Sequence, residues 1–310
     1  MKNVVIALLL AVFMSPLMSS PGKVGPWPGD EWPSATPEEQ GMDSARLAEM
    51  LDTIAKNETN IDSVLVLRNG HSVLDAYVAP VDPDMLHHVA SVSKSFTATL
   101  VGIATGQGFI PGVETPLLDL FPGYEPAEPD PRRDAATLEN LLTMSTGWNC
   151  HDSASSDGIE ALWASPDWVQ HMLDLPMIYD PGTHFEYCNG GSYLLGAAVE
   201  VAAGQSLADF AETYLFAPLG ITDYQWNTAP DGRPLGYTGL QLRPRDMARL
   251  GYLYLHDGVW NDEQLVPADF ITAARTPHIE TGGIIAHYGY RSKTMARCIC
   301  ASSVATPTRP

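Results

Sequence analysis

The sequence has little positive charge, few cysteines and, beyond its N-terminal end, no long apolar run. Its 310 residues include 17 lysines and arginines against 37 aspartates and glutamates, so the formal net charge is −20. Such a surface repels phosphate backbones, and we expect no nucleic-acid partner. Only 17% of the residues are charged whereas 45% are hydrophobic, which indicates a folded globular protein.

Metal-binding histidine patterns are missing as well. None of the nine histidines falls in an H-E-x-x-H or comparable arrangement. The adjacent His87 and His88 are interpreted as packing residues ahead of a helix. We therefore expect no metal and no other cofactor. The chain also lacks internal repeats and low-complexity tracts.

The N-terminal stretch MKNVVIALLLAVFMSPLMSS has the outline of a secretory signal peptide. One lysine precedes an apolar segment, and small residues follow near Ser20. A membrane anchor is the alternative, but Ser15-Pro16 interrupts the run, which is short for a span. We expect residues 1–20 to be cleaved and the protein to be periplasmic or secreted, without a stable membrane anchor after cleavage.

Export makes disulfides possible, and the chain has four cysteines. Cys150 and Cys188 flank chemically interesting segments and form a possible pair. A bond closing a loop of that size contributes about 3–4 kcal/mol in the chain-entropy model. Cys298 and Cys300 lie too close in the chain to pair easily with each other.

The first part of the chain predicts an arm, a helix and a hairpin. Residues 21–40 are rich in proline and tryptophan and should form an extended arm lying on the domain. Asp43 is a predicted N-cap for a helix with one apolar stripe. Two strand-like runs then flank Asn69-Gly70, the strongest short-range hairpin signal.

Further helices are predicted downstream. Thr137 should cap one, residues 161–177 should form a single amphipathic helix, and Ser206 with Asp209 resembles a capping box. Residues 243–258 predict another helix, whose inward face should hold Met247, Leu250, Leu253 and Leu255.

The stretch HHVASVSKSFTATLVGIA holds Ser91 and, three residues on, Lys94. Residues at i and i+3 share a helix face, so the hydroxyl and the amine can meet. Lysine is a useful base when burial or a neighbouring charge lowers its pKa. The small, apolar residues that follow suit a helix crossing a protein core. A helix cap with a solvated lysine is the alternative interpretation.

The segment FEYCNGG holds a second pattern, Tyr187-x-Asn189, where an extended loop runs into a helix. A core tyrosine and an asparagine turn would account for it alone. However, this is the only Tyr-x-Asn in the chain, and Ser91-x-x-Lys94 is the only Ser-x-x-Lys after Lys23. Their order in the chain, with a helical insertion between them, favours a catalytic role for both patterns.

Together these patterns resemble the serine β-lactamase and penicillin-binding protein superfamily, in particular its class C-related serine hydrolases. The resemblance covers roughly residues 35–290 and implies an α+β, β-lactamase/transpeptidase-like fold. In that fold an antiparallel sheet, flanked by helices, is built from both ends of the chain, and a helical subdomain is inserted. The matching stretches are HHVASVSKSFTATLVGIA, TLENLLTMSTG, FEYCNGGSYLLGAAVE, LFAPLGITDYQW and GLQLRPRDMARLGYLYL.

The resemblance also implies roles in an acyl-enzyme mechanism. Ser91 would be the nucleophile, and its backbone N–H one oxyanion donor. Lys94 would take the Ser91 proton or hold Tyr187 as the stronger acceptor. Tyr187 would relay a proton to the leaving group and activate the deacylating water. Asn189 would orient Lys94 and the substrate.

The family's third motif, a glycine-containing strand that donates the second oxyanion N–H, should follow Tyr290. Lys293-Thr294 has Met295 in place of the glycine, and Thr281-Gly282-Gly283 comes too early. Residues 291–310 also lack the alternating apolar pattern of strands. We therefore expect a truncated or frame-shifted product whose C-terminal strands and helix are missing.

The predicted organisation is a signal peptide (1–20), an arm (21–40), an incomplete catalytic domain (41–290) and a non-family tail (291–310). The leading function is hydrolysis of an ester or amide, β-lactams included, with a small-molecule or peptide-like acyl substrate. A low-activity DD-peptidase or penicillin-binding protein and a non-catalytic remnant are the alternatives. The sequence does not decide the oligomeric state.

Overall fold

The computed structural model describes residues 25–57, 59–150, 157–282 and 287–290. The predicted signal peptide, the tail with Cys298 and Cys300, and Lys293-Thr294 lie outside these ranges. The α-helices are α1 (Ser44–Lys56), α2 (Ser93–Gly106), α3 (Pro131–Asp134), α4 (Leu138–Leu142), α5 (Asp157–Ala164), α6 (Trp168–Leu173), α7 (Asn189–Ala203), α8 (Leu207–Ala211), α9 (Ala217–Leu219), α10 (Pro244–Leu255) and α11 (Ala268–Arg275).

The strands are short. They are β1 (Ser63–Arg68), β2 (His71–Tyr77), β3 (His87–His88), β4 (Tyr224–Trp226), β5 (Leu240–Leu242), β6 (Val259–Trp260), β7 (Glu263–Gln264), β8 (Ile279–Glu280) and β9 (His287–Tyr288). Three 3-10 turns (Glu38–Gln40, Ala90–Val92 and Leu118–Leu120) and one π-helical turn (Glu212–Phe216) complete the list.

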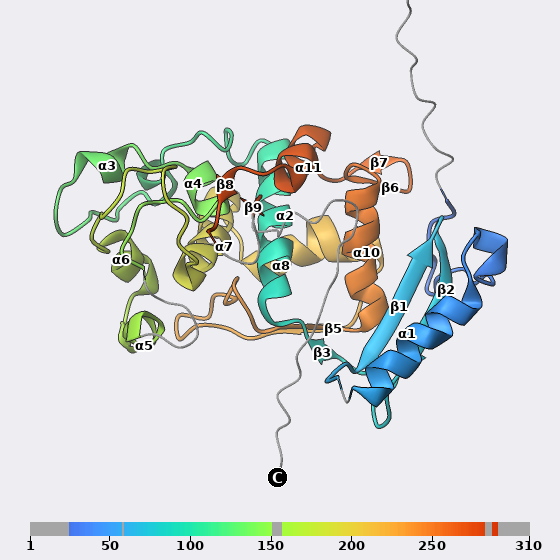
Figure 1. Ribbon diagram of the computed structural model, residues 1–310. Helices are drawn as coiled ribbons and strands as arrows, with labels where there is room; N and C mark the ends of the chain where they lie inside the picture. The colour runs from blue at the N-terminus through green and yellow to red at the C-terminus, as the bar shows by residue number, and fades with distance from the viewer. Residues whose placement is uncertain (1–24, 58, 151–156, 283–286, 291–310) are drawn as a thin grey trace, which may run out of the picture.

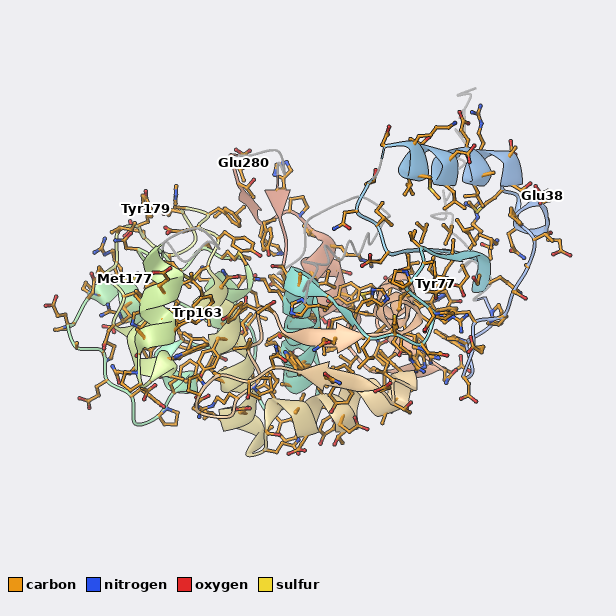
Figure 2. All side chains as sticks on the ribbon, turned by 90° about the horizontal axis from the view of Figure 1, so that it is seen from below. Glu38, Tyr77, Trp163, Met177, Tyr179 and Glu280 are labelled. Atoms are coloured by element: carbon orange, nitrogen blue, oxygen red, sulfur yellow. A yellow bond between two sulfur atoms is a disulfide. The ribbon has the colours of Figure 1, made fainter. Side chains whose placement is uncertain are left out.

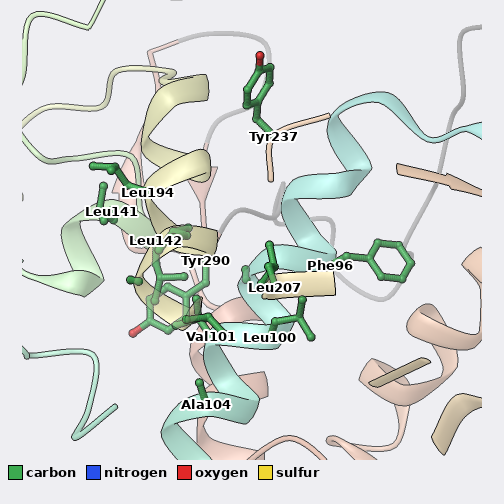
Figure 3. Close-up of a cluster of buried hydrophobic side chains, with 14 of the residues drawn as sticks. Phe96, Leu100, Val101, Ala104, Leu141, Leu142, Leu194, Leu207, Tyr237 and Tyr290 are labelled. Carbon is green, nitrogen blue, oxygen red and sulfur yellow. The ribbon is translucent and has the colours of Figure 1, made fainter. Parts of the chain in front are cut away.

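Helix α2 runs through the middle of the molecule, with α10 and the β1–β2 hairpin on one side and the α3–α6 helices on the other (Figure 1). It is buried along most of its length, because small and apolar residues cover its whole circumference. Its close packing partner is α7, which is equally rich in small residues. Figure 3 shows part of the resulting core, in which Phe96 of α2 points to one side of the helix and Leu141, Leu142 and Leu194 lie on the other.

The strand pairs are all antiparallel in the described parts of the chain. Strand β5 lies between β3 and β4, so that His87 pairs with Leu242 and Tyr224 pairs with the same leucine. This three-stranded sheet sets the start of α2, because β3 ends only two residues before Ala90. The N-terminal hairpin pairs with no C-terminal strand among the described residues.

The N-terminal predictions are confirmed in their main elements. Asn69 and Gly70 both have positive φ and connect β1 to β2, as the hairpin signal requires. The carboxylate of Asp43 accepts from the Ala45 N–H and begins α1. From residue 25 the arm crosses α10, and Trp27 packs on Tyr252 with ring centroids 5.4 Å apart. The end of the arm forms the 3-10 turn at Glu38–Gln40 in place of extended backbone.

Two helix predictions are wrong in detail. Residues 161–177 do not form one helix, because α5 ends before Pro166 and Asp167 caps a new helix, α6. Leu255 is 57% exposed, although Leu250 and Leu253 are buried as predicted. Two residues past Leu253, at about 100° per residue, Leu255 points to the opposite side of α10.

The capping predictions are confirmed. Thr137 forms a complete capping box with Asn140 at the start of α4. Ser206 accepts from the Asp209 N–H and begins α8, which continues through the π-helical turn into α9 and ends at Gly220. In the part of the chain that is described, no helix has the length and apolar character to cross a bilayer.

Candidate active site

Ser91 lies in the 3-10 turn that links β3 to α2, and it is exposed. The residue before it, Ala90, has φ 45°, a left-handed conformation that is costly for a residue with a Cβ. Two side chains hold it there. His88 Nδ1 accepts from the Ala90 N–H at 3.1 Å, and Ser93 Oγ donates to the Ala90 carbonyl at 2.7 Å.

These contacts correct one sequence interpretation. His87 is buried as expected, but His88 is exposed and binds backbone, so its role is not packing. The strained turn places the Ser91 hydroxyl in solvent, whereas most of α2 is buried. It also sets the Ser91 N–H near the N-terminal end of α2, where the helix dipole favours negative charge.

Lys94 is one turn along and reaches back to Ser91. Its Nζ lies 3.0 Å from Ser91 Oγ and 2.9 Å from the Tyr237 carbonyl oxygen. The side chain is only 1% exposed. The structure therefore brings the predicted serine and lysine together as the i, i+3 spacing requires, with the amine out of bulk water.

Tyr187 contacts the same serine from the other side. Its hydroxyl donates to Ser91 Oγ at 3.0 Å, and its ring centroid is 5.0 Å from Lys94 Nζ. The chain before it is anchored because the Glu186 N–H donates to the Met144 carbonyl. Ser91 Oγ therefore lies between the amine of Lys94 and the phenol of Tyr187, whose sequence separation is 93.

Asn189 is the first residue of α7, is buried and follows Tyr187 by two positions. Asn189 is thus close in the chain to Tyr187, the residue with which it forms the predicted pattern. That it orients Lys94 remains a prediction.

Cys150 and Cys188 form a disulfide with their Cα atoms 5.9 Å apart. Cys188 is the N-cap of α7 and stands between Tyr187 and Asn189. The bond ties the start of this helix to the segment after Trp148, which itself pairs with Met177. Through Cys188, the segment that carries Tyr187 and Asn189 is thereby covalently linked to the segment around Cys150.

One member of the site could not be found by sequence reasoning. Tyr237 contributes its backbone carbonyl to Lys94, and any residue type can supply a carbonyl. The side chain has a separate contact: Trp163 of α5 donates its indole N–H to the Tyr237 hydroxyl at 2.9 Å. Trp163 is 55% exposed.

The arrangement is suited to covalent catalysis by serine. One exposed hydroxyl accepts hydrogen bonds from a buried amine and from a phenol. The amine can take a proton when it is neutral, and the phenol can take one when it is ionised. Among the described residues, no group of three or more His, Cys, Asp or Glu side chains could hold a metal ion.

Comparison with known proteins identifies the relatives. A family model described as Beta-lactamase matches residues 47–290. A 6-aminohexanoate-dimer hydrolase of Paenarthrobacter ureafaciens is 28% identical over 239 residues, which cover 73% of this chain and 60% of that protein. A D-aminopeptidase of Brucella canis is 29% identical over 196 residues, covering 58% of this chain and 36% of the enzyme.

A solved structure gives the same result for the fold. The octameric penicillin-binding protein homologue from Pyrococcus abyssi superposes with a TM-score of 0.61 at 20% identity, covering 81% of this chain and 64% of that one. The predicted β-lactamase/transpeptidase-like fold is therefore confirmed. The alignments with the hydrolase and the aminopeptidase span less than two thirds of either relative's length.

Proposed function

Because the chain belongs to the β-lactamase family of serine hydrolases, we propose that it cleaves an ester or amide bond through an acyl-enzyme on Ser91. One observation carries the proposal. The Ser91 hydroxyl is exposed while Lys94 Nζ and the Tyr187 hydroxyl each lie 3.0 Å from its oxygen. A nucleophile with a base in hydrogen-bond reach, and a further group orienting that base, is the signature of nucleophilic catalysis.

In the first step Ser91 Oγ attacks the substrate carbonyl carbon and the C=O π bond breaks to leave an oxyanion. The Ser91 proton passes to Lys94 if the amine is neutral, or to Tyr187 if the phenol is ionised. The Ser91 N–H would donate to the oxyanion. Collapse of this intermediate breaks the bond to the leaving group, which takes up the proton.

In the second step a water molecule attacks the acyl carbon and restores Ser91. Tyr187 is well placed to accept the water's proton, because its hydroxyl contacts the oxygen that is being released. The released Ser91 oxygen recovers a proton from the same pair of groups. The products are the free acid and the regenerated hydroxyl.

The substrate we propose is a small-molecule or peptide-like acyl compound, with an amide favoured over an ester. The relatives named for activity, a 6-aminohexanoate-dimer hydrolase and a D-aminopeptidase, support this class. We also propose that the protein acts in the periplasm or outside the cell, since its N-terminal sequence has the outline of a signal peptide.

The test is intact-mass detection of an adduct on the full chain. The panel holds a fluorophosphonate, a labelled penicillin, a chromogenic cephalosporin, a nitrophenyl ester and a linear amide dimer. We expect a single adduct that disappears in Ser91→Ala and persists in Ser44→Ala, an exposed serine at the start of α1.

The pattern of turnover selects the activity. Turnover of the ester or amide without reaction of the β-lactams supports the proposal, and rapid cephalosporin turnover extends it to lactamase activity. A stable penicillin adduct without turnover identifies a penicillin-binding protein instead. If wild type and Ser91→Ala give the same masses and rates with every compound, the chain is not a catalyst.

A further inference from the structure

The loop that gives Lys94 its carbonyl acceptor is fixed at its inner end. This loop, residues 227–239, connects β4 to β5. Thr97 Oγ1 donates to the Gly236 carbonyl at 2.8 Å, next to the Tyr237 carbonyl that Lys94 binds. Gly236 has φ +69°, and a Cβ there would lie 2.6 Å from the Ser192 carbonyl oxygen. The backbone thus packs directly on α7.

The outer end of the loop is fixed by charge. Arg233 Nε lies 2.7 Å from Glu200 Oε2, and Arg233 Nη1 lies 2.6 Å from Asp231 Oδ2. The hydroxyl of Tyr193 donates to the same aspartate oxygen at 2.5 Å. Because Tyr193 and Glu200 both belong to α7, the loop is held to two points of one helix.

The pKa values of Tyr193 and Asp231 are shifted by their burial and by the hydrogen bonds within this cluster. Burial raises the pKa of Tyr193, and its hydrogen bond to Asp231 raises it further. Burial also acts on Asp231, but hydrogen bonds from Tyr193 and Arg233 outweigh it and hold the pKa of this carboxyl below its ordinary value. The tyrosine is therefore a neutral donor and the aspartate an ionised acceptor at neutral pH.

We propose that Asp231 and Arg233 are positioning residues for Lys94: by fastening the 227–239 loop to α7 they hold the Tyr237 carbonyl against the lysine amine. The inference rests on the proposed function of Lys94 as a partner of Ser91. Helix α7 begins at Asn189, two residues after Tyr187, so the helix to which the loop is fastened also positions the tyrosine that contacts the Ser91 oxygen.

A consequence for the lysine follows from the direction of the hydrogen bond. A carbonyl oxygen that accepts from Nζ stabilises the charged form of an amine and raises its pKa. Releasing the loop removes that acceptor, so the pKa of Lys94 should fall. Whether catalysis needs the neutral or the charged amine, the limb of the pH–rate profile that reports Lys94 moves to lower pH.

The experiment compares Arg233→Gln and Tyr193→Phe with wild type. We expect kcat to fall about tenfold in Arg233→Gln, the size of effect caused by losing one hydrogen bond to a charged group. KM should change little, and Arg233→Lys should recover part of the rate. The matched control is Arg46→Gln, which removes an exposed ion pair with Glu49 on α1.

A second measurement does not depend on turnover. The chain has only five lysines, so the Lys94 side chain can be followed by carbon-13 NMR at Cε across a pH titration. We expect its midpoint to be lower in Arg233→Gln than in wild type and unchanged in Arg46→Gln. Absence of a Ser91 adduct in wild type would refute the proposed function while this titration still tests the loop. Equal Lys94 midpoints in wild type and Arg233→Gln overturn the inference, whatever the rates.

Discussion

The helical centre of the molecule, α2 with α7, differs sharply from its N-terminal unit, α1 with the β1–β2 hairpin. Most residues of α2 and α7 are buried, whereas α1 has no buried residue. In the hairpin, β1 is half-buried and only Val73 of β2 is fully buried. Figure 2 shows the same contrast, because α1 stands at the edge of the molecule with side chains in solvent.

The difference has a local origin in each helix. Helix α2 meets neighbours all round, and at Gly102 an added Cβ would lie 2.6 Å from the Phe270 ring. Helix α1 has the predicted stripe of Leu47, Leu51 and Ile54, but these side chains are only half-buried. The candidate site is therefore built on the part of the fold that is held from every side, as precise positioning of Ser91 and Lys94 demands.

The largest expected effect is on stability. Phe96 of α2 is fully buried and packs edge-to-face on Phe216, so Phe96→Ala should lower the free energy of unfolding by about 3–5 kcal/mol. In α1 the matched change, Leu51→Ala, should cost about 1 kcal/mol because the leucine is already partly in water. Urea unfolding at equilibrium measures both. An equal loss in the free energy of unfolding at the two positions would contradict the difference in burial between the two regions.

The disulfide should matter to the centre and not to the N-terminal unit. Replacing Cys150 and Cys188 by serine removes a link across 38 residues and should cost about 3–4 kcal/mol. Because Cys188 adjoins Tyr187, acylation of Ser91 should also slow. Hydrogen exchange should rise at the start of α7 and stay constant in α1. Faster exchange confined to α1 would contradict the assignment of this bond to the site.

The smallest effect is a pH response of the arm. His256 lies against Trp27 and Tyr252, and burial there lowers the pKa of its imidazole. The contribution to stability is therefore fully present above the ordinary pKa near 6.5 and is lost as pH falls through the lower folded-state value. We expect the Trp27 environment to change as the pH falls below about 6.5, as followed by fluorescence.

A variant isolates this response. His256→Gln cannot take up a proton in that range and should give a flat profile of fluorescence against pH. At each pH the Ser91 acylation rate should be the same in the two proteins. Should the fluorescence change persist in His256→Gln, another group is responsible.

Sequence reasoning reached the parts of the site that depend on local spacing. Ser91 and Lys94 are one helical turn apart, and residues at i and i+3 lie on the same face of a helix. The Tyr-x-Asn pattern was recognisable as a pattern, but its contact with Ser91 required the fold, since Tyr187 follows the serine at a sequence separation of 96. The break at Pro166 and the outward Leu255 show where periodicity alone misled.

By itself the sequence determined the family, the i, i+3 pair at the start of α2, the helix caps and the hairpin turn, because these depend on residue type and short spacing. Tertiary structure alone decided that Lys94 binds the Tyr237 carbonyl, that His88 holds the left-handed Ala90, and that Asp231 and Arg233 fasten their loop to α7. Backbone carbonyls and amides are common to every residue, so which of them meets a given side chain is written only in three-dimensional packing.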